Sequence, residues 1–306
     1  MDARLEQLLG RPVLRKQKLY GFWRRYFRRD PGHVNKWYVE AGTCRYKVIE
    51  LTATGKQNKE TCATFQHWKY CLEQYKGKNI LPNMHAHDDV FIALEWLEGY
   101  TFIERKEALE NATVSSLCDF YIRTFLHNSS SGPQKHRQMV LGYLSESLQY
   151  KIIKNDVYEM CQRSLERPGF LPYQTTTGLC LADTFMANFL VQPNKAFRFI
   201  DIDGIYTADK MEMICKFVLN LPSKFRSIAL ERLELTNAND VKYLPYYLMA
   251  ALATRICAKS RHYRNSRCNP KYILLRKNVA KAVAQLETLV NGIHANQSIE
   301  HLIPKQ

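Results

Sequence analysis

The sequence predicts an α+β protein with a small mixed N-terminal part and a larger, mainly helical C-terminal part. Two observations support this fold class. Apolar and aromatic runs of strand length, separated by turn residues, occur mainly between residues 37 and 97. From residue 98 to residue 306, apolar residues recur mostly at helical spacing. A chain of 306 residues is long enough to bury a substantial core in both parts.

Residues 1–36 form a basic N-terminal segment, and residues 14–29 within it have a helical pattern. At helical spacing the aromatic side chains fall on one arc and the arginines on the opposite arc. A cationic face backed by an aromatic face is typical of a helix that lies on an anionic membrane. The alternative is that the aromatic stripe packs on the protein body and the arginines are solvated.

The N-terminal part from 37 to 97 begins with a hairpin predicted over residues 36–51, with a turn at Glu40–Thr43. A helix is expected from Lys59 to Tyr75, and an apolar strand from Val90 to Leu97. The polar turn at 85–89, which reads His-Ala-His-Asp-Asp, could hold a metal, but a solvated connection between strands is the simpler interpretation.

The C-terminal part is predicted to contain seven helices, interrupted by a β-like insertion at 179–205 and by a loop at 129–133. The expected helices lie near residues 104–127, 133–153, 154–166, 207–219, 223–234, 239–259 and 276–294.

The net charge of +15 is concentrated at two places in the chain. Residues 1–36 hold ten basic and three acidic side chains, residues 255–281 hold nine basic and no acidic ones, and residues 37–254 hold 24 of each. This distribution indicates an anionic partner. The sequence shows no membrane span and no signal peptide, and its nine scattered cysteines suit a reducing cytosol.

Three polar residues carry the candidate chemistry. Asp183 stands five residues before Asn188, and Asp201 follows thirteen residues later at the end of an apolar strand. Phosphoryl transfer from ATP needs a carboxylate that accepts the proton of the acceptor hydroxyl. It also needs oxygen ligands that hold Mg²⁺ against the phosphates.

In this order and spacing the three residues resemble the protein-kinase-like superfamily. The fragment Ile200-Asp-Ile-Asp203 looks more like its small-molecule branch, and most like the kinases of lipopolysaccharide core sugars, Kdo or heptose. The resemblance implies a bilobal protein-kinase-like fold with a small β-rich N-lobe and a larger helical C-lobe. It implies Asp183 as the catalytic residue, Asn188 and Asp201 as magnesium ligands, and ATP and Mg²⁺ as cofactors, with 179–205 as the catalytic loop.

The same resemblance assigns further residues by their order in the chain. Lys47 would bind the phosphates of ATP, with Lys56 as the second choice. Its partner on the following helix would be Glu60, with Glu73 as the alternative. The segment from Glu95 to Leu97 would be the hinge that receives adenine through its backbone.

Two departures from the family pattern leave the activity open. Leu181 and Ala182 stand where the family usually has His-Gly or His-Arg before the catalytic Asp, and no Gly-x-Gly-x-x-Gly sequence occurs. The first hypothesis is an ATP-dependent kinase that phosphorylates a sugar hydroxyl of an anionic glycolipid such as lipopolysaccharide inner core. The enzyme would be cytoplasmic and would bind the inner-membrane surface through residues 14–29.

The second hypothesis is an inactive kinase-like module that binds a polyanion, either nucleic acid or a membrane surface. Tyr263 alternates with Arg261, Arg264 and Arg267, a pattern that suits phosphate contacts and base stacking. A hydrolase is a third reading that no motif supports, since the sequence contains no Gly-x-Ser-x-Gly.

Overall fold

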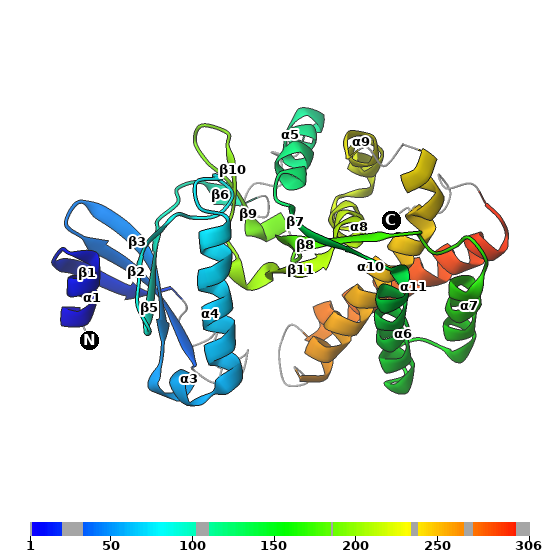
Figure 1. Ribbon diagram of the computed structural model, residues 1–306, viewed down its shortest axis with the longest axis horizontal. Coiled ribbons are helices and arrows are strands. Elements are labelled where there is room, and N and C mark those ends of the chain that lie inside the picture. Colours follow the sequence, from blue (N-terminus) through cyan, green and yellow to red (C-terminus); the bar gives the residue numbers. More distant parts are fainter. Residues whose placement is uncertain are drawn as a thin grey trace. The chain divides into compact units, whose positions relative to one another are not determined.

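The computed structural model describes residues 2–19, 33–101, 110–184, 186–233, 238–265 and 272–297. In chain order, the elements of these residues (Figure 1) are α1 (Asp2–Leu9), β1 (Val13–Lys18), β2 (Val34–Ala41), β3 (Cys44–Leu51), α3 (Ala53–Gln57), α4 (Lys59–Gln74), β4 (Met84–His87), β5 (Phe91–Glu95), β6 (Tyr100–Thr101), α5 (Asn111–Ile122), β7 (Leu126–Ser131), α6 (Pro133–Gln149), α7 (Asn155–Glu166), β8 (Thr175–Leu181), the 3-10 helix η2 (Met186–Asn188), β9 (Phe189–Val191), β10 (Phe197–Phe199), η3 (Ile202–Gly204), β11 (Ile205–Asp209), α8 (Lys210–Asn220), η4 (Ser223–Phe225), α9 (Arg226–Arg232), α10 (Ala238–Asn265) and α11 (Tyr272–His294).

The chain divides into two compact units. Unit 1 consists of residues 1–105 together with 187–205, and unit 2 consists of residues 106–186 together with 206–306. The segment 187–205 therefore leaves unit 2 to join unit 1, and the chain returns to unit 2 after Ile205.

Unit 1 is built on an antiparallel sheet of five strands in the order β1-β2-β3-β5-β4. The hairpin predicted over 36–51 is confirmed as β2 and β3, which pair from Val34 opposite Leu51 to Ala41 opposite Cys44. Gly42 occupies the turn with a φ of +57°, a backbone conformation that residues with a Cβ rarely adopt. The predicted apolar strand is confirmed as β5, which pairs with both β3 and β4.

The two faces of this sheet bury different partners. Helix α1 and helix α4 lie on opposite sides of the sheet (Figure 1). The apolar cluster on the α1 side combines helix residues with alternate strand residues. Its buried members are Leu5, Leu9, Val39, Ala41, Tyr46, Val48, Val90, Phe91 and Ala93. Because side chains alternate along a strand, Lys36, Tyr38 and Lys47 lie on the opposite face of the sheet.

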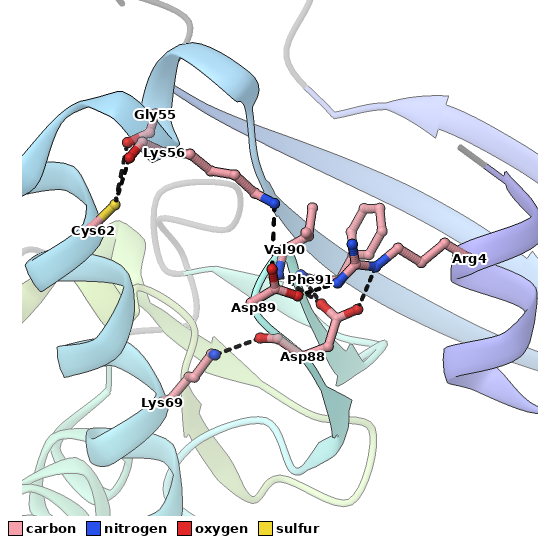
Figure 2. Close-up of polar contacts among 9 residues, drawn as sticks. All are labelled: Arg4, Gly55, Lys56, Cys62, Lys69, Asp88, Asp89, Val90 and Phe91. Atoms are coloured by element: carbon pink, nitrogen blue, oxygen red, sulfur yellow. Dashed lines mark hydrogen bonds and ion pairs between the residues drawn. The ribbon is translucent and has the colours of Figure 1, made fainter.

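The turn between β4 and β5 is held by ion pairs (Figure 2). The Arg4 guanidinium lies 2.8 Å from the Asp88 carboxylate and also pairs with Asp89. Lys56 approaches Asp89 at 3.4 Å, and Lys69 donates to the Asp88 carbonyl. These contacts connect α1, α3 and α4 to one turn. The 85–89 segment is therefore the end of β4 followed by a turn with a structural role.

The helix predicted over residues 14–29 is wrong where the structure describes it. Val13–Lys18 is strand β1, which pairs antiparallel with β2 so that Lys18 lies opposite Trp37. Lysine ammonium groups of Lys16 and Lys18 lie 4.6 Å and 5.2 Å from the Trp37 ring centroid. Pairing with β2 thus overrides the helical pattern at Val13–Lys18. Residues 20–32 lie outside the described part of the chain.

Unit 2 combines the helices α5 to α11 with a sheet of three strands in the order β11-β8-β7. The predicted helices near 133–153, 154–166, 239–259 and 276–294 are confirmed as α6, α7, α10 and α11. Two expectations are wrong: residues 129–131 belong to strand β7 instead of a loop, and residues 207–209 belong to β11 instead of a helix. In both cases pairing with the buried strand β8 decides the conformation.

A buried polar network joins three helices of unit 2. His136 on α6 lies 2.6 Å from the Tyr246 hydroxyl and 2.7 Å from the Glu212 carboxylate. Glu212 also accepts from Thr254 at 2.7 Å and pairs with Lys216 at 2.8 Å. Burial alone would raise the pKa of Glu212, but Lys216 and His136 hold that pKa at about 2. This carboxylate therefore stays ionised and fixes α6, α8 and α10 to one another.

None of the eight cysteines in the described residues forms a disulfide, and six of them are buried. Burial raises the pKa of Cys71 to about 11 and that of Cys161 to about 12, so these thiols are inert at neutral pH. Over the residues that the structure describes, none of the helices has the length and apolar character to cross a bilayer.

Candidate active site

The β9–β10 hairpin brings the two predicted metal ligands together in unit 1. Phe189 lies opposite Phe199, and the Ile200 amide donates to the Asn188 carbonyl at 2.9 Å. Asn188 and Asp201 therefore flank the same end of the hairpin, although they are thirteen residues apart in sequence. Both residues are half-buried.

Lys47 reaches the same place from strand β3. Its ammonium group donates to the Ile200 carbonyl at 3.1 Å, next to Asp201. Burial lowers the pKa of Lys47 to about 8, with a further lowering by Lys36, while Asp201 and Asp203 oppose the shift. The ammonium is thus largely protonated at neutral pH, and it faces the candidate metal ligands.

Lys36 and Asp203 complete this cluster, and the sequence analysis missed both. The Lys36 ammonium lies 3.0 Å from the Asp203 carboxylate, and it also lies 5.9 Å from the Trp68 ring centroid. The alternation along β2, in which Lys36 stands two residues before Tyr38, is the signal that could have identified it. Asp203 could have been noticed as the second Asp of the Ile-Asp-Ile-Asp fragment.

The other assigned charges lie elsewhere in unit 1. Lys56, the alternative phosphate-binding residue, pairs with Asp89 at the β4–β5 turn (Figure 2). Glu60 is exposed in the first turn of α4, and Glu73 pairs with Lys76 at 3.6 Å. Within the described residues neither carboxylate forms an ion pair with Lys47, so the expected lysine–glutamate partnership is absent from this part of the chain.

The predicted hinge follows β5 directly. The Glu95 carboxylate accepts from both nitrogens of Asn83, at 2.9 Å and 3.0 Å, and the Trp96 amide donates to the Arg45 carbonyl at 3.1 Å. In the described part of the chain, no hydrogen bond uses the Leu97 backbone. The Glu95 side chain is therefore committed to structure.

Asp183 belongs to unit 2, two residues after the end of β8, and its side chain is exposed. Two residues before Asp183, the Leu181 carbonyl accepts from the Tyr121 hydroxyl at 2.9 Å. Tyr121 is fully buried and stacks on Phe217 with a centroid distance of 4.4 Å. On the other side, the Thr184 hydroxyl accepts from Asn220 at 2.7 Å. Asp183 is thus held between two anchored residues, without the His that the family pattern places before it.

Cations gather around Asp183 within unit 2. Arg255 on α10 donates to the Leu219 carbonyl, one residue before the Asn220 that holds Thr184. Lys259 lies one helical turn further along α10, on the same side as Arg255. Burial lowers the pKa of Lys259 to about 8, with further lowering by Arg255 and Lys281, whereas Asp183 raises that pKa. Lys259 therefore interacts electrostatically with Asp183, and Arg255 and Lys281 interact with Lys259.

No protein-family model matches this sequence, and no curated protein sequence matches it significantly. Solved structures do resemble it. Macrolide 2'-phosphotransferase MphH from Brachybacterium faecium aligns with a TM-score of 0.64 at 12% identity, covering 92% of this chain and 98% of its own. Choline kinase LicA from Streptococcus pneumoniae aligns with a TM-score of 0.60 at 14% identity, covering 92% and 97%.

A third similar structure is spectinomycin phosphotransferase APH(9)-Ia in complex with ADP and spectinomycin. It aligns with a TM-score of 0.57 at 14% identity, covering 98% of both chains. These neighbours are small-molecule kinases of the protein-kinase-like fold, and the alignments span nearly the whole of each chain. The antiparallel sheet of unit 1 is the N-lobe, the helices of unit 2 form the C-lobe, and the chain has the bilobal protein-kinase-like fold.

Proposed function

We propose that this protein transfers the terminal phosphate of ATP to a hydroxyl group of an anionic sugar or glycolipid. The observation that carries the proposal is the grouping of Lys47, Asn188 and Asp201 at one end of the β9–β10 hairpin. Phosphoryl transfer needs little covalent chemistry from the protein. It needs cations and metal ligands in fixed positions, which this grouping supplies.

The donor set fits Mg²⁺, because the Asp201 carboxylate and the Asn188 amide offer hard oxygen ligands at neighbouring positions. Bound there, Mg²⁺ would neutralise charge on the transferring phosphate. In this proposal Lys47 binds phosphate oxygens through its ammonium group, and the Leu97 backbone binds adenine. Asp183 orients the acceptor hydroxyl, and its carboxylate accepts the proton that the hydroxyl loses.

The anionic acceptor is supported by the cations near Asp183. Asp183 acts on the pKa of Lys259, and Arg255 and Lys281 act on the same lysine. Positive charge at this position would repel a cationic acceptor and attract a carboxylate or phosphate. Lipopolysaccharide inner core has such groups. We propose it as the acceptor, with the enzyme at the cytoplasmic face of the inner membrane and residues 14–29 near the lipid surface.

Nucleotide binding tests the first half of the proposal. A ligand that binds only the native state at a hundred times its Kd raises stability by about 2.7 kcal/mol, so ATP with Mg²⁺ should raise the Tm. Lys47→Met should lower ATP affinity by roughly tenfold to a hundredfold. Lys56→Met, which removes only the ion pair with Asp89, should leave that affinity unchanged. Equal losses in the two lysine variants would contradict the assignment of Lys47.

Catalysis and the acceptor need a separate experiment. Asp183→Asn should bind ATP as the wild type does, yet transfer phosphate at least a hundredfold more slowly. Cells that carry only this variant should lose phosphate from lipopolysaccharide inner core, measured by mass spectrometry of the purified glycolipid. If ATP with Mg²⁺ leaves the Tm unchanged while a polyanion raises it, the protein is the inactive polyanion-binding module.

A further inference from the structure

Lys36 and its ion-pair partner Asp203 belong to the Lys47–Asp201 cluster, but the proposed function gives neither of them a role. It stands on β2, whose Tyr38 lies directly opposite Lys47 on β3. Lys36 is two residues from Tyr38 and shares its face of the sheet. Such diagonal positions lie about 7–8 Å apart between Cα atoms, so both ammonium groups can reach one extended ligand.

The two lysines end on the same short segment, on either side of the candidate metal ligand. Lys47 donates to the Ile200 carbonyl at 3.1 Å, and Lys36 lies 3.0 Å from the Asp203 carboxylate. Asp201 stands between these two attachment points. The Lys36 side chain is only 14% exposed, and the Asp203 side chain is 44% exposed, so the lysine is the deeper member of the pair. A long side chain confined in this way has already lost much of its conformational entropy.

The proximity of two ammonium groups is unfavourable without an anion. Burial lowers the pKa of Lys47, Lys36 lowers it further, and the nearby carboxylates of Asp201 and Asp203 raise it. A polyphosphate that meets a metal ion at Asp201 would pass between both lysines and neutralise their repulsion. The sequence also has no Gly-x-Gly-x-x-Gly loop, whose backbone amides would otherwise supply donors to the phosphates.

We propose that Lys36 is a second phosphate-binding residue for the nucleotide. In the nucleotide-free protein the Lys36 ammonium group pairs with Asp203. When ATP binds, the same ammonium group pairs with a phosphate oxygen instead. This inference rests on the proposed function, because it takes the Lys47–Asp201 cluster as the nucleotide site. It adds that the N-lobe supplies two lysine side chains to the polyphosphate, one from each of two adjacent strands.

The test compares ATP with adenosine, which has no phosphate, by isothermal titration of the full-length protein in the presence of Mg²⁺. Lys36→Met keeps an apolar stem against Trp68 and removes the ammonium group. It should weaken ATP binding by roughly tenfold to a hundredfold and leave adenosine binding unchanged. Lys36→Arg should recover most of the loss. Lys76→Met, which removes an exposed ion pair with Glu73 on the same unit, is the matched control and should change neither affinity.

Asp203→Asn gives an independent readout if Lys36→Met does not fold. Releasing the lysine should leave ATP affinity unchanged or make it a few-fold tighter. The inference is overturned if Lys36→Met leaves ATP affinity intact, if it weakens ATP and adenosine equally, or if Asp203→Asn weakens ATP binding. Failure of the wild type to bind either ligand is a different result, because it removes the proposed function together with this inference.

Discussion

Asp209 is a buried carboxyl whose ionisation the fold disfavours. Its Oδ1 caps α8 by accepting from the Glu212 amide at 3.0 Å, whereas its Oδ2 is buried without a hydrogen-bond partner in the described residues. Burial raises the pKa of Asp209 from 3.8 to about 6, against an opposing effect of His136. The native state therefore holds this proton to higher pH than the unfolded chain does.

This shift predicts a pH dependence of stability with a definite sign. Between pH 4 and pH 6 the native state binds more protons at Asp209, so its contribution to stability falls as the pH rises. The loss is complete above pH 6 and reaches about 3 kcal/mol at most, since each pKa unit is worth about 1.4 kcal/mol. Asp209→Asn keeps a cap without an ionisable group, so at pH 7.5 it should be more stable than the wild type.

Urea unfolding of both proteins from pH 4.5 to pH 8 measures this effect. The stability advantage of Asp209→Asn should grow as the pH rises from 4.5 to about 6 and should level off above that pH. A difference between the two proteins that stays constant across this range would mean that the Asp209 carboxyl does not titrate as its burial implies.

At the scale of elements, two helical glycines differ in the space around them. A Cβ at Gly55, in α3, would lie 2.2 Å from the His33 carbonyl oxygen and 2.8 Å from a Leu51 methyl carbon. A Cβ at Gly142, in the middle of α6, would have no heavy atom within 4 Å. The first glycine permits close packing of α3 onto the chain before β2, and the second only weakens its own helix.

Alanine substitutions at these glycines should therefore have opposite effects. Gly55→Ala should destabilise the protein by about 1–3 kcal/mol, because backbone must move to admit the methyl group. Gly142→Ala should stabilise it by up to about 1 kcal/mol through helix propensity. Chemical denaturation of the two variants beside the wild type gives both values. Shifts of the same sign would show that the packing around α3 is looser than the contacts at Gly55 indicate.

At the scale of the whole molecule, the N-lobe is completed by a segment, residues 187–205, that interrupts the C-lobe in sequence. The Phe199 amide donates to the Ile80 carbonyl at 2.8 Å, and Arg198 donates to the Leu81 carbonyl at 2.9 Å. Strand β6 pairs with β9 through Tyr100 and Val191. Residues 1–105 alone lack all of these partners, although they contain the entire five-stranded sheet.

This arrangement predicts which fragments of the chain fold. Residues 1–105 should show a broad, weakly cooperative thermal transition in near-UV circular dichroism. Joining residues 187–205 to them through a flexible Gly/Ser linker should sharpen the transition and raise its midpoint. The same fusion with Phe189→Ser and Phe199→Ser, which removes two fully buried rings, is the control and should not do so. An equally cooperative transition for residues 1–105 would show that the hairpin is dispensable.

Local features made much of this fold predictable. The hairpin over 36–51 has alternating side chains around a turn glycine, and α4, α10 and α11 have long runs of helical periodicity. The candidate metal ligands could be found for the same reason. Asn188 and Asp201 are joined by a short hairpin, so their proximity depends on nearby residues alone.

Other features were decided by contacts between distant segments. Strand β1 was mistaken for part of a helix because its pairing with β2 crosses the intervening residues 20–32. Lys36 and Asp203 are 167 residues apart, and no local pattern relates them.

The sequence by itself determined the chemical groups, the order of the elements and the spacing from Asp183 to Asp201. Only the tertiary structure decided that Lys47 rather than Lys56 lies beside Asp201, and that Lys36 shares its sheet face. The physical reason is that strand register and helix docking are set by burial of apolar side chains from many segments at once. The position of a charged side chain then follows from the position and register of its strand.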